Sequence, residues 1–315
     1  MAQKGVGRRD LRARKLQVYL KNNWQLYALL VIPIAFVIIF KYAAYPGMRI
    51  AFMNYKPAKG FDGSPWVGFE TFEKVFKDKS FHTALRNSLV FNFLDLIVGF
   101  PVPIILALLL NELRFDRYKK VSQTILYLPH FLSWPIIASV MLTLFKPETG
   151  LVNVALMNLG IIDKGIPFLT EKWHWAVSYL LIGVWQNMGW GSIIYLAAIT
   201  GIDGQLYEAA TIDGASRIQR IRYINIPTIV PTIIILLIMR MGSLVSVGYE
   251  KVYLLQNDLN VEVSEVISTY VYKRGLLQNN YSFSTAVGLF NNVVNIALLL
   301  ITNFITRRVS DTSLF

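Results

Sequence analysis

Residues 206–216 run Leu206-Tyr207-Glu208-Ala209-Ala210-Thr211-Ile212-Asp213-Gly214-Ala215-Ser216, a polar segment between two long apolar runs. The flanking runs, about Trp175–Ile199 and Pro227–Val247, are each long enough to cross a bilayer core of about 30 Å as a helix. A polar segment between two such helices lies in water, because unpaired polar groups are costly in lipid. The segment therefore predicts a membrane protein whose helices are joined, at this point, by a structured loop.

The loop itself carries the signals of two short helices separated by a turn. Asp203 can cap a helix that begins near Gly204, because its side-chain oxygen accepts free N–H groups. Gly214 ends that helix, since glycine adopts left-handed backbone angles cheaply, and a second short helix is expected over Ala215–Ile224. Pro227 suits the first turn of the next span, where its missing N–H costs nothing. We therefore expect the loop to form a compact docking element.

The composition of the whole chain agrees with a membrane protein. Of its 315 residues, 54% are hydrophobic and 16% charged, against about 25% charged in soluble proteins, and the mean hydropathy is +0.45. There are no cysteines, which excludes disulfides, thiolate metal sites and a cysteine nucleophile. The chain is expected to form one transmembrane domain.

Six apolar windows have the length of a membrane-spanning helix. Their long, continuous apolar character, without period-2 alternation, predicts helices rather than barrel strands. The first window is expected to remain as an uncleaved span, because its basic lead-in and apolar run are longer than those of a signal peptide. The windows are approximately Trp24–Tyr45, Leu85–Leu110, Thr124–Phe145, Trp175–Ile199, Pro227–Val247 and Ser284–Ile305.

The distribution of Lys and Arg predicts the direction of the spans. Basic residues gather before the first window, after the second, after the fourth and after the sixth. Since cytoplasmic segments carry this excess, six spans place both termini in the cytoplasm. The predicted regions are a basic cytoplasmic segment (1–23), a transmembrane domain (24–308) with a cytoplasmic loop (201–226), and a cytoplasmic tail (309–315). Topology thus explains most of the +12 charge, and nucleic acid is not expected as a partner.

The segment at 206–216, followed by Pro227, resembles the EAA signature of the permease subunits of binding-protein-dependent ABC importers. The fuller phrase L-Y-E-A-A-x-I-D-G-A is typical of their carbohydrate-uptake branch. Two later segments, Gly248–Leu255 and Val266–Gly275, resemble parts of the permeases for polysaccharides and complex oligosaccharides. Trp66–Phe76 resembles a segment that precedes the second span in sugar permeases, and it is expected to form a short amphipathic helix. That helix either caps the outer face, which is the preferred interpretation, or contacts a binding protein directly.

The resemblance implies an all-helical type I importer permease with six spans, in the bacterial cytoplasmic membrane, that moves a carbohydrate into the cell. It implies as partners a second homologous permease, two ATP-binding subunits and an extracellular solute-binding protein or lipoprotein, besides membrane lipid. ATP and Mg²⁺ would be bound by the partner ATPase, so no cofactor is expected on this chain. The residues expected to couple to the ATPase are Tyr207, Glu208, Ala209, Ala210, Asp213 and Gly214.

Nothing in the sequence predicts chemistry on the chain itself. It has no G-x-x-x-x-G-K-[ST] phosphate loop. Its three histidines, His82, His130 and His174, lack metal-ligand spacing and are expected at interfaces or helix ends. We therefore expect neither a catalytic nor a metal site, and we take the chain to be a non-enzymatic subunit.

Two ionisable residues fall at membrane depth, where they are expensive and usually functional. Asp95 lies about ten residues into the second span, and Arg240 lies about ten residues below the outer end of the fifth. At about 1.5 Å per residue their depths match, so we expect an ion pair. It can serve helix packing or contact the substrate, and packing is the preferred interpretation.

Uncharged polar and aromatic residues of the later spans are the candidates for the substrate pathway, because sugars are bound by aromatic faces and hydrogen-bonding groups. The competing interpretation of the same residues is hydrogen bonding between helices. Asn291 and Asn295 share one helix face. The candidates are Asn187, Trp190, Tyr195, Tyr249, Asn291 and Asn295.

Other functions remain open on sequence grounds. An amino-acid or peptide permease of the same superfamily is the nearest rival, and the L-Y-E-A-A-x-I-D-G-A phrase argues against it. A secondary transporter would need coupling-ion carboxylates and usually repeated halves, and a membrane enzyme would need a convergent catalytic cluster. Neither pattern is evident in the sequence.

Overall fold

The computed structural model describes residues 18–309, which form helices and loops without a β-strand. Most of the predicted N-terminal segment 1–23 and of the tail 309–315 lies outside the described residues. The first half contains α2 Trp24–Val37, η1 Ile38–Tyr42, η2 Tyr45–Phe52, η3 Pro57–Lys59, α3 Glu70–Lys77, α4 Lys79–Leu94, η4 Asp95–Gly99, α5 Pro101–Asn111, α6 Asp116–Tyr127, η5 Leu128–Phe131, α7 Trp134–Leu144 and α8 Leu151–Asn158. The second half contains α9 Lys172–Thr200, α10 Gly204–Ile212, α11 Arg217–Arg220, η6 Ile221–Asn225, α12 Ile226–Met241, α13 Tyr249–Leu255, α14 Val261–Ser264, α15 Ile267–Tyr272, η7 Lys273–Leu277 and α16 Tyr281–Val309.

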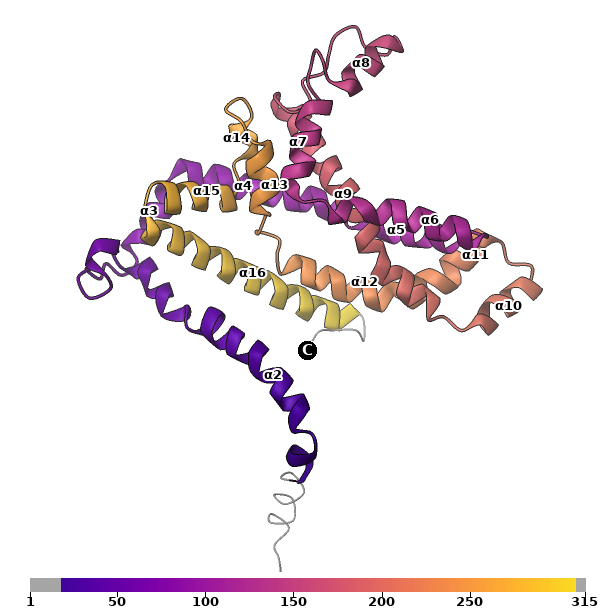
Figure 1. Ribbon diagram of the computed structural model, residues 1–315, viewed down its shortest axis with the longest axis horizontal. Coiled ribbons are helices and arrows are strands. Elements are labelled where there is room, and N and C mark those ends of the chain that lie inside the picture. Colours follow the sequence, from indigo (N-terminus) through magenta and orange to yellow (C-terminus); the bar gives the residue numbers. More distant parts are fainter. Residues whose placement is uncertain (1–17, 310–315) are drawn as a thin grey trace, which may run out of the picture.

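Long helices make up the body of the molecule (Figure 1). By length and composition, four continuous helices among the described residues can cross a membrane, and one bent pair raises the number to five. The four are Trp24–Phe52, Lys79–Asn111, Arg217–Met241 and Tyr281–Arg308. The remaining predicted span corresponds to α9, which has 29 residues and is therefore about 43 Å long, but carries polar residues such as Gln186 and Asn187.

The predicted third span, Thr124–Phe145, is not one continuous helix. It is divided between α6 with η5 and α7, and the two parts meet at an angle of 99°. The break falls at Leu132 and Ser133, which are both extended. Pro135 follows in the first turn of α7, where it lacks an N–H to continue the preceding helix. The sequence interpretation missed this bend because the apolar window runs unbroken through it.

Two other long helices contain a π-helical turn just before a proline. In Lys79–Asn111 the π-turn η4, Asp95–Gly99, comes just before Pro101. In Arg217–Met241 the π-turn η6, Ile221–Asn225, comes just before Pro227. Because proline removes one backbone donor and crowds the preceding turn, the wider π-turn lets the helix continue. Pro227 therefore lies within a continuous helix, not at its free start as the sequence predicted.

Three buried clusters hold the helices together. One joins α4, α7, α9 and α13 around Trp175 and Tyr179, and a second joins η2, α3, α4, α15 and α16 around Phe81. The third joins α5, α9 and α12 around Tyr195 and Ile199. The predicted outer helix in Trp66–Phe76 is found as α3, beginning at Glu70.

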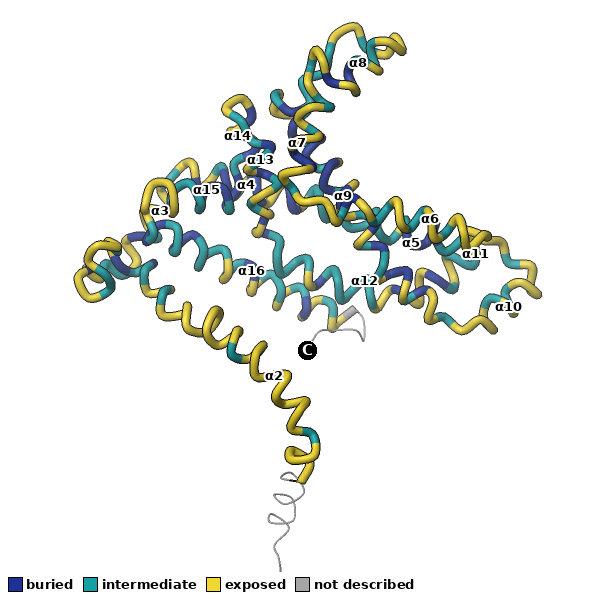
Figure 2. Tube along the Cα trace, in the orientation of Figure 1, coloured by how far each residue is buried: buried dark blue, intermediate teal, exposed yellow. Residues whose placement is uncertain are grey.

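The ends of the molecule are formed by different short elements. Helices α10 and α11 lie at one end of the long axis in Figure 1, and α3 lies near the other. Helix α2 runs away from the other long helices and has no buried residue, so it is almost entirely exposed in Figure 2. An apolar helix with this exposure needs lipid or a partner protein around it.

Candidate functional site: a polar cavity between the long helices

A cavity of about 640 Å³ lies between α4–η4–α5, α7, α9, α12 and α13. Its wall combines aromatic rings, amides and hydroxyls with three charged groups. The aromatic lining residues are Phe91, Phe100, Trp134, Tyr179 and Tyr195; the polar ones are Asn92, Asn187, Ser243 and Ser246; the charged ones are Asp95, Arg240 and Lys251. Small-molecule sites usually combine an apolar lining with a few convergent polar groups, and this cavity contains both.

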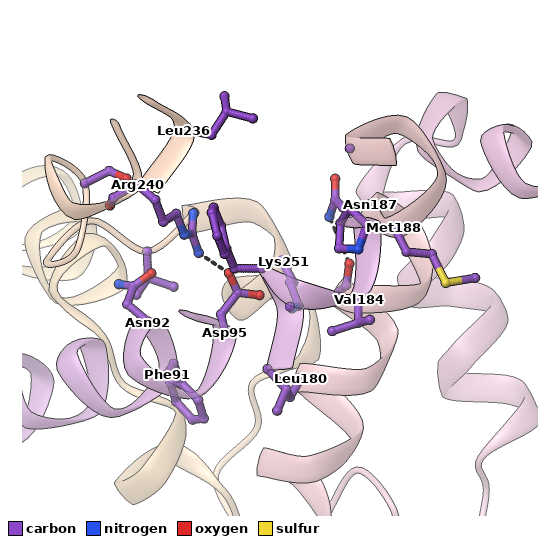
Figure 3. A pocket seen from close by; sticks show the side chains of 18 of the residues that line it. Phe91, Asn92, Asp95, Leu180, Val184, Asn187, Met188, Leu236, Arg240 and Lys251 are labelled. Atoms are coloured by element: carbon purple, nitrogen blue, oxygen red, sulfur yellow. Dashed lines mark hydrogen bonds and ion pairs between the residues drawn. The ribbon is translucent and has the colours of Figure 1, made fainter. Parts of the chain in front are cut away.

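Asp95 and Arg240 meet on the cavity wall, as Figure 3 shows. The guanidinium Nη2 of Arg240 on α12 donates to Oδ2 of Asp95 in η4, and the two side chains are 34% and 35% exposed. A Cβ atom at Gly99 would lie 2.2 Å from Asp95 Oδ1, so the glycine leaves room for the carboxylate. The structure thus brings together the two ionisable residues that the sequence placed at equal depth.

Lys251 is the third charged group of the cavity. Its Nζ lies 3.6 Å from the centroid of the Tyr179 ring and 5.5 Å from that of Trp134. Gly183 on α9 makes this position available, because a Cβ atom there would lie 2.1 Å from Lys251 Nζ. The short helix α13 therefore places the Lys251 ammonium against the rings of Tyr179 and Trp134, inside the helix bundle.

Of the predicted pathway residues, Asn187 and Tyr195 line the cavity. Asn187 Oδ1 accepts a hydrogen bond of 3.2 Å from Nδ1 of His130, and the Asn187 amide donates one of 2.9 Å to the carbonyl of Gly183. Trp190 is not among the lining residues; its ring stacks on His130 at a centroid distance of 4.8 Å. Trp190 thus lies next to the cavity lining and orients His130.

The other three predicted pathway residues also lie away from the cavity lining. Asn295 donates a hydrogen bond of 2.9 Å to Ser246 and accepts one of 3.1 Å from the amide of Val245, and Asn291 donates one of 3.3 Å to Ser246. These bonds connect α16 to the segment after α12, as the interhelical interpretation expects. Tyr249 packs on the rings of Tyr253 and Tyr272.

The loop at 201–226 has the predicted helix-turn-helix form. Asp203 accepts a hydrogen bond of 3.0 Å from the amide of Gln205 at the start of α10. Gly214 adopts a φ of +74° and separates α10 from α11. Ser216 and Gln219 form a capping box at α11, although this helix is shorter than the predicted Ala215–Ile224 and continues into η6.

Tyr207 faces the loop interior, and the other predicted coupling residues lie toward its surface. The hydroxyl of Tyr207 donates a hydrogen bond of 2.5 Å to Oδ1 of Asn225, which is fully buried. Burial raises the pKa of Tyr207, so the hydroxyl keeps its proton and remains a donor. Ala210 is half-buried, and the exposed members are Glu208, Ala209, Asp213 and Gly214.

Three cavity residues, Lys251, Tyr179 and Asn92, are not among those that the sequence predicted. Lys251 lies just beyond an apolar window, where a lysine is expected to reach water. Its one sequence signal is its place in Gly248–Leu255, where it follows Glu250 and precedes Val252 and Tyr253. The residues that hold it, Gly183 and Tyr179, come from another helix, and sequence spacing cannot bring them together.

The chain is similar to known transport proteins over almost its whole length. It is 43% identical to protein LplB of Bacillus subtilis, over 94% of this chain and 92% of that protein. It is 40% identical to the polygalacturonan/rhamnogalacturonan transport system permease protein YteP of the same organism, over 96% of this chain and 94% of that protein. A crystal structure of a bacterial ABC transporter involved in the import of the acidic polysaccharide alginate contains a chain that is 40% identical, with a TM-score of 0.84 over 94% of this chain and 99% of that one.

The family model of the binding-protein-dependent transport system inner membrane component matches residues 82–311. This range contains the cavity helices, the loop between α9 and α12, and α16. The match covers well over half of the chain, and the relatives match 94–96% of it. The chain therefore belongs to the family of binding-protein-dependent transport system inner membrane components.

Proposed function

We propose that this chain is a permease subunit of an ABC importer that moves an oligosaccharide into the cell. The observation that carries the proposal is the cavity, whose aromatic and hydrogen-bonding groups come from the same helices that continue into the exposed loop at 201–226. Aromatic faces and amide or hydroxyl groups are the chemistry that recognises sugars. YteP and the alginate transporter, by their descriptions, handle polysaccharide-derived substrates, and this supports the same class here.

The proposed partners are a second permease of the same family, two ATPase subunits that bind ATP and Mg²⁺, and an extracellular solute-binding protein. A structural relative was crystallised with a pentasaccharide-bound periplasmic protein. The loop supports docking to an ATPase, because the apolar side chains of Ile212 and Ile218 are 86% and 77% exposed on it. Large apolar side chains with such exposure indicate a protein contact when they gather with small residues such as Ala209.

The loop also offers a mechanical connection to the cavity. Helix α9 ends at Thr200, immediately before α10, and α11 continues through η6 into α12. Both α9 and α12 line the cavity. We infer that ATP-driven closure of the ATPase pair moves the loop and thereby rearranges the two helices, so that the cavity opens alternately to the two sides of the membrane.

The proposed topology has six spans with both termini in the cytoplasm. The long helices Trp24–Phe52, Lys79–Asn111, Arg217–Met241 and Tyr281–Arg308 provide four spans, the bent pair provides one and α9 provides the sixth. The domain division at residues 23 and 308 follows from this order. Accessibility of single introduced cysteines to an impermeant thiol reagent tests the topology directly, since the chain has none of its own.

The experiment that tests the proposed function is purification of the tagged chain from its native membrane in mild detergent, followed by mass spectrometry. Recovery of a second permease and an ATPase is expected. The recovered complex, reconstituted with its binding protein, should take up radiolabelled oligosaccharide only when ATP is present. A chain that is recovered alone and still transports a solute after reconstitution would contradict the proposal and favour a secondary carrier.

A further inference from the structure

We propose that Lys251 provides the cavity with a binding site for a carboxylate, and that the transported oligosaccharide therefore contains uronic acid residues. This inference rests on the proposed function and adds the substrate class. It is carried by the placement of the Lys251 ammonium on the cavity wall, beside an ion pair that is already complete (Figure 3).

The charge of the cavity is the first argument. Its lining contains two cations, Arg240 and Lys251, and one anion, Asp95. Arg240 pairs with Asp95. Among residues 18–309, no carboxylate lies within ion-pair distance of Lys251. The lining therefore holds one basic group in excess. Burial lowers the pKa of Lys251 to about 7, so an anion bound beside it would favour the charged ammonium.

The local structure around Lys251 shows that the ammonium is held in place. Its Nζ lies over the Tyr179 ring at 3.6 Å, and Gly183 supplies the space that any larger residue would fill. A ring face attracts a cation through its negative charge density, but it cannot accept charge-assisted hydrogen bonds from the three N–H groups of lysine. The site orients the cation and leaves its donors available to a ligand on the cavity side.

The neighbouring lining matches the rest of a uronic acid residue. The ring of Trp134 provides a face for the C–H side of a sugar, and Asn92 and Asn187 provide amides for its hydroxyls. A carboxylate on the same sugar would form a charge-assisted hydrogen bond with Lys251. A neutral sugar would use the same ring and amides equally well but would leave the ammonium without an anion.

The charge of the cavity can be measured without transport, because the chain has no cysteine. Val184 lines the cavity beside Lys251, so V184C places a single thiol there. In the full complex, we would treat this thiol with an anionic and with a cationic methanethiosulfonate reagent. The increase in the mass of this chain over time gives the two reaction rates. We expect K251M to lower the anionic-to-cationic rate ratio about fivefold or more and K251R to preserve it. K74M, which removes an exposed lysine of α3, is the matched control and should leave the ratio unchanged.

The substrate class is tested in the reconstituted complex with two probes of the same linkage, α-1,4-linked trigalacturonate and neutral α-1,4-galactotriose. We expect K251M to reduce ATP-driven uptake of trigalacturonate about tenfold or more, the scale of one lost charge-assisted hydrogen bond. Uptake of galactotriose should stay within twofold of the wild type, and K251R should restore trigalacturonate uptake.

The outcomes separate this inference from the proposed function. If the wild-type complex takes up galactotriose but not trigalacturonate, or if K251M affects both probes equally, the importer proposal survives and the carboxylate site is refuted. If it takes up neither probe and no other oligosaccharide, the proposed function fails. A rate ratio at V184C that does not depend on Lys251 would refute the positive site regardless of transport.

Discussion

Arg240 of α12 pairs with Asp95 of η4, although 145 positions separate them in the sequence. The pair joins the long helices Lys79–Asn111 and Arg217–Met241, and Gly99 leaves the space in which the carboxylate lies. Each side chain is about one-third exposed to the cavity. The pair therefore neutralises two costly charges at membrane depth while keeping both in contact with the cavity space.

We expect D95N and R240Q each to destabilise the complex by about 1–3 kcal/mol, less than the loss of a fully buried pair, because the cavity solvates the remaining charge. The double variant D95N/R240Q should recover part of this loss, since no unpaired charge remains. Thermal unfolding of the purified complex in detergent, arranged as a double-mutant cycle, measures the coupling. Additive losses in the double variant would show that the two residues act independently.

The sequence predicted some parts of this site and missed others for physical reasons. Asp95 and Arg240 could be paired because regular rise along a helix converts sequence position into depth. Asn291 and Asn295 could be assigned to one face, but not to the cavity or to a neighbouring helix, because helix rotation depends on packing. The 99° bend after η5 was missed because hydropathy reports the apolar length of a segment and not its direction.

The position of Lys251 could not be predicted either, because sequence position does not show how remote helices pack together. Its surroundings consist of Gly183 and Tyr179 on α9 and Trp134 on α7, and all three are remote in the sequence. The loop at 201–226 was predicted well because its caps and its turn are local. Asp203 and Gly214 act on residues only a few positions away.

Asp78, which precedes α4, should make the stability of the protein sensitive to acid. Its side chain caps α4 by accepting a hydrogen bond of 2.7 Å from the amide of Ser80, and it accepts bonds of 2.8 and 2.9 Å from Tyr270 and Arg274. Partial burial alone would raise the pKa of Asp78, but these hydrogen bonds and the Arg274 charge outweigh it and lower the pKa below 3.8.

A lowered pKa in the folded state means that the ionised carboxylate contributes stability above about pH 4. This contribution should be lost as the pH falls through the folded-state pKa. We expect D78N, in which Asn can still cap the helix, to lose about 1 kcal/mol at pH 7 and to show a flatter pH dependence below pH 4. Thermal unfolding from pH 7 to pH 3 measures both; parallel curves for the two proteins would contradict the assignment.

Glu208 is exposed on α10, the first helix of the loop at 201–226. If it forms a polar contact with the ATPase, E208K should replace that contact with a repulsion and lower substrate-stimulated ATP hydrolysis about tenfold or more, the scale of a lost charged hydrogen bond. The matched control is E148K, which reverses an exposed carboxylate between α7 and α8. Equal activity of E208K and the wild type would remove Glu208 from the interface.

Gly214 and Gly204 offer a matched pair for testing the turn in the loop. A Cβ atom at either position would meet nothing within 4 Å, but Gly214 has a φ of +74° whereas Gly204 begins α10 with an ordinary φ. G214A should therefore cost about 1–2 kcal/mol through backbone strain alone. G204A should be neutral or slightly stabilising, because it only reduces the freedom of the unfolded chain.

The functional consequence follows from the position of the turn between α10 and α11. A strained turn shifts the exposed side chains of Ile212 and Ile218 relative to one another, so G214A should weaken ATPase binding and transport together, while G204A should affect neither. Asparagine tolerates left-handed angles better than alanine, and G214N should recover part of the activity. Measurement of ATPase retention on the purified permease, with uptake in proteoliposomes, compares the three variants. If G214A and G204A behave alike, the left-handed turn has no role in coupling, and the loop must dock through its helices alone.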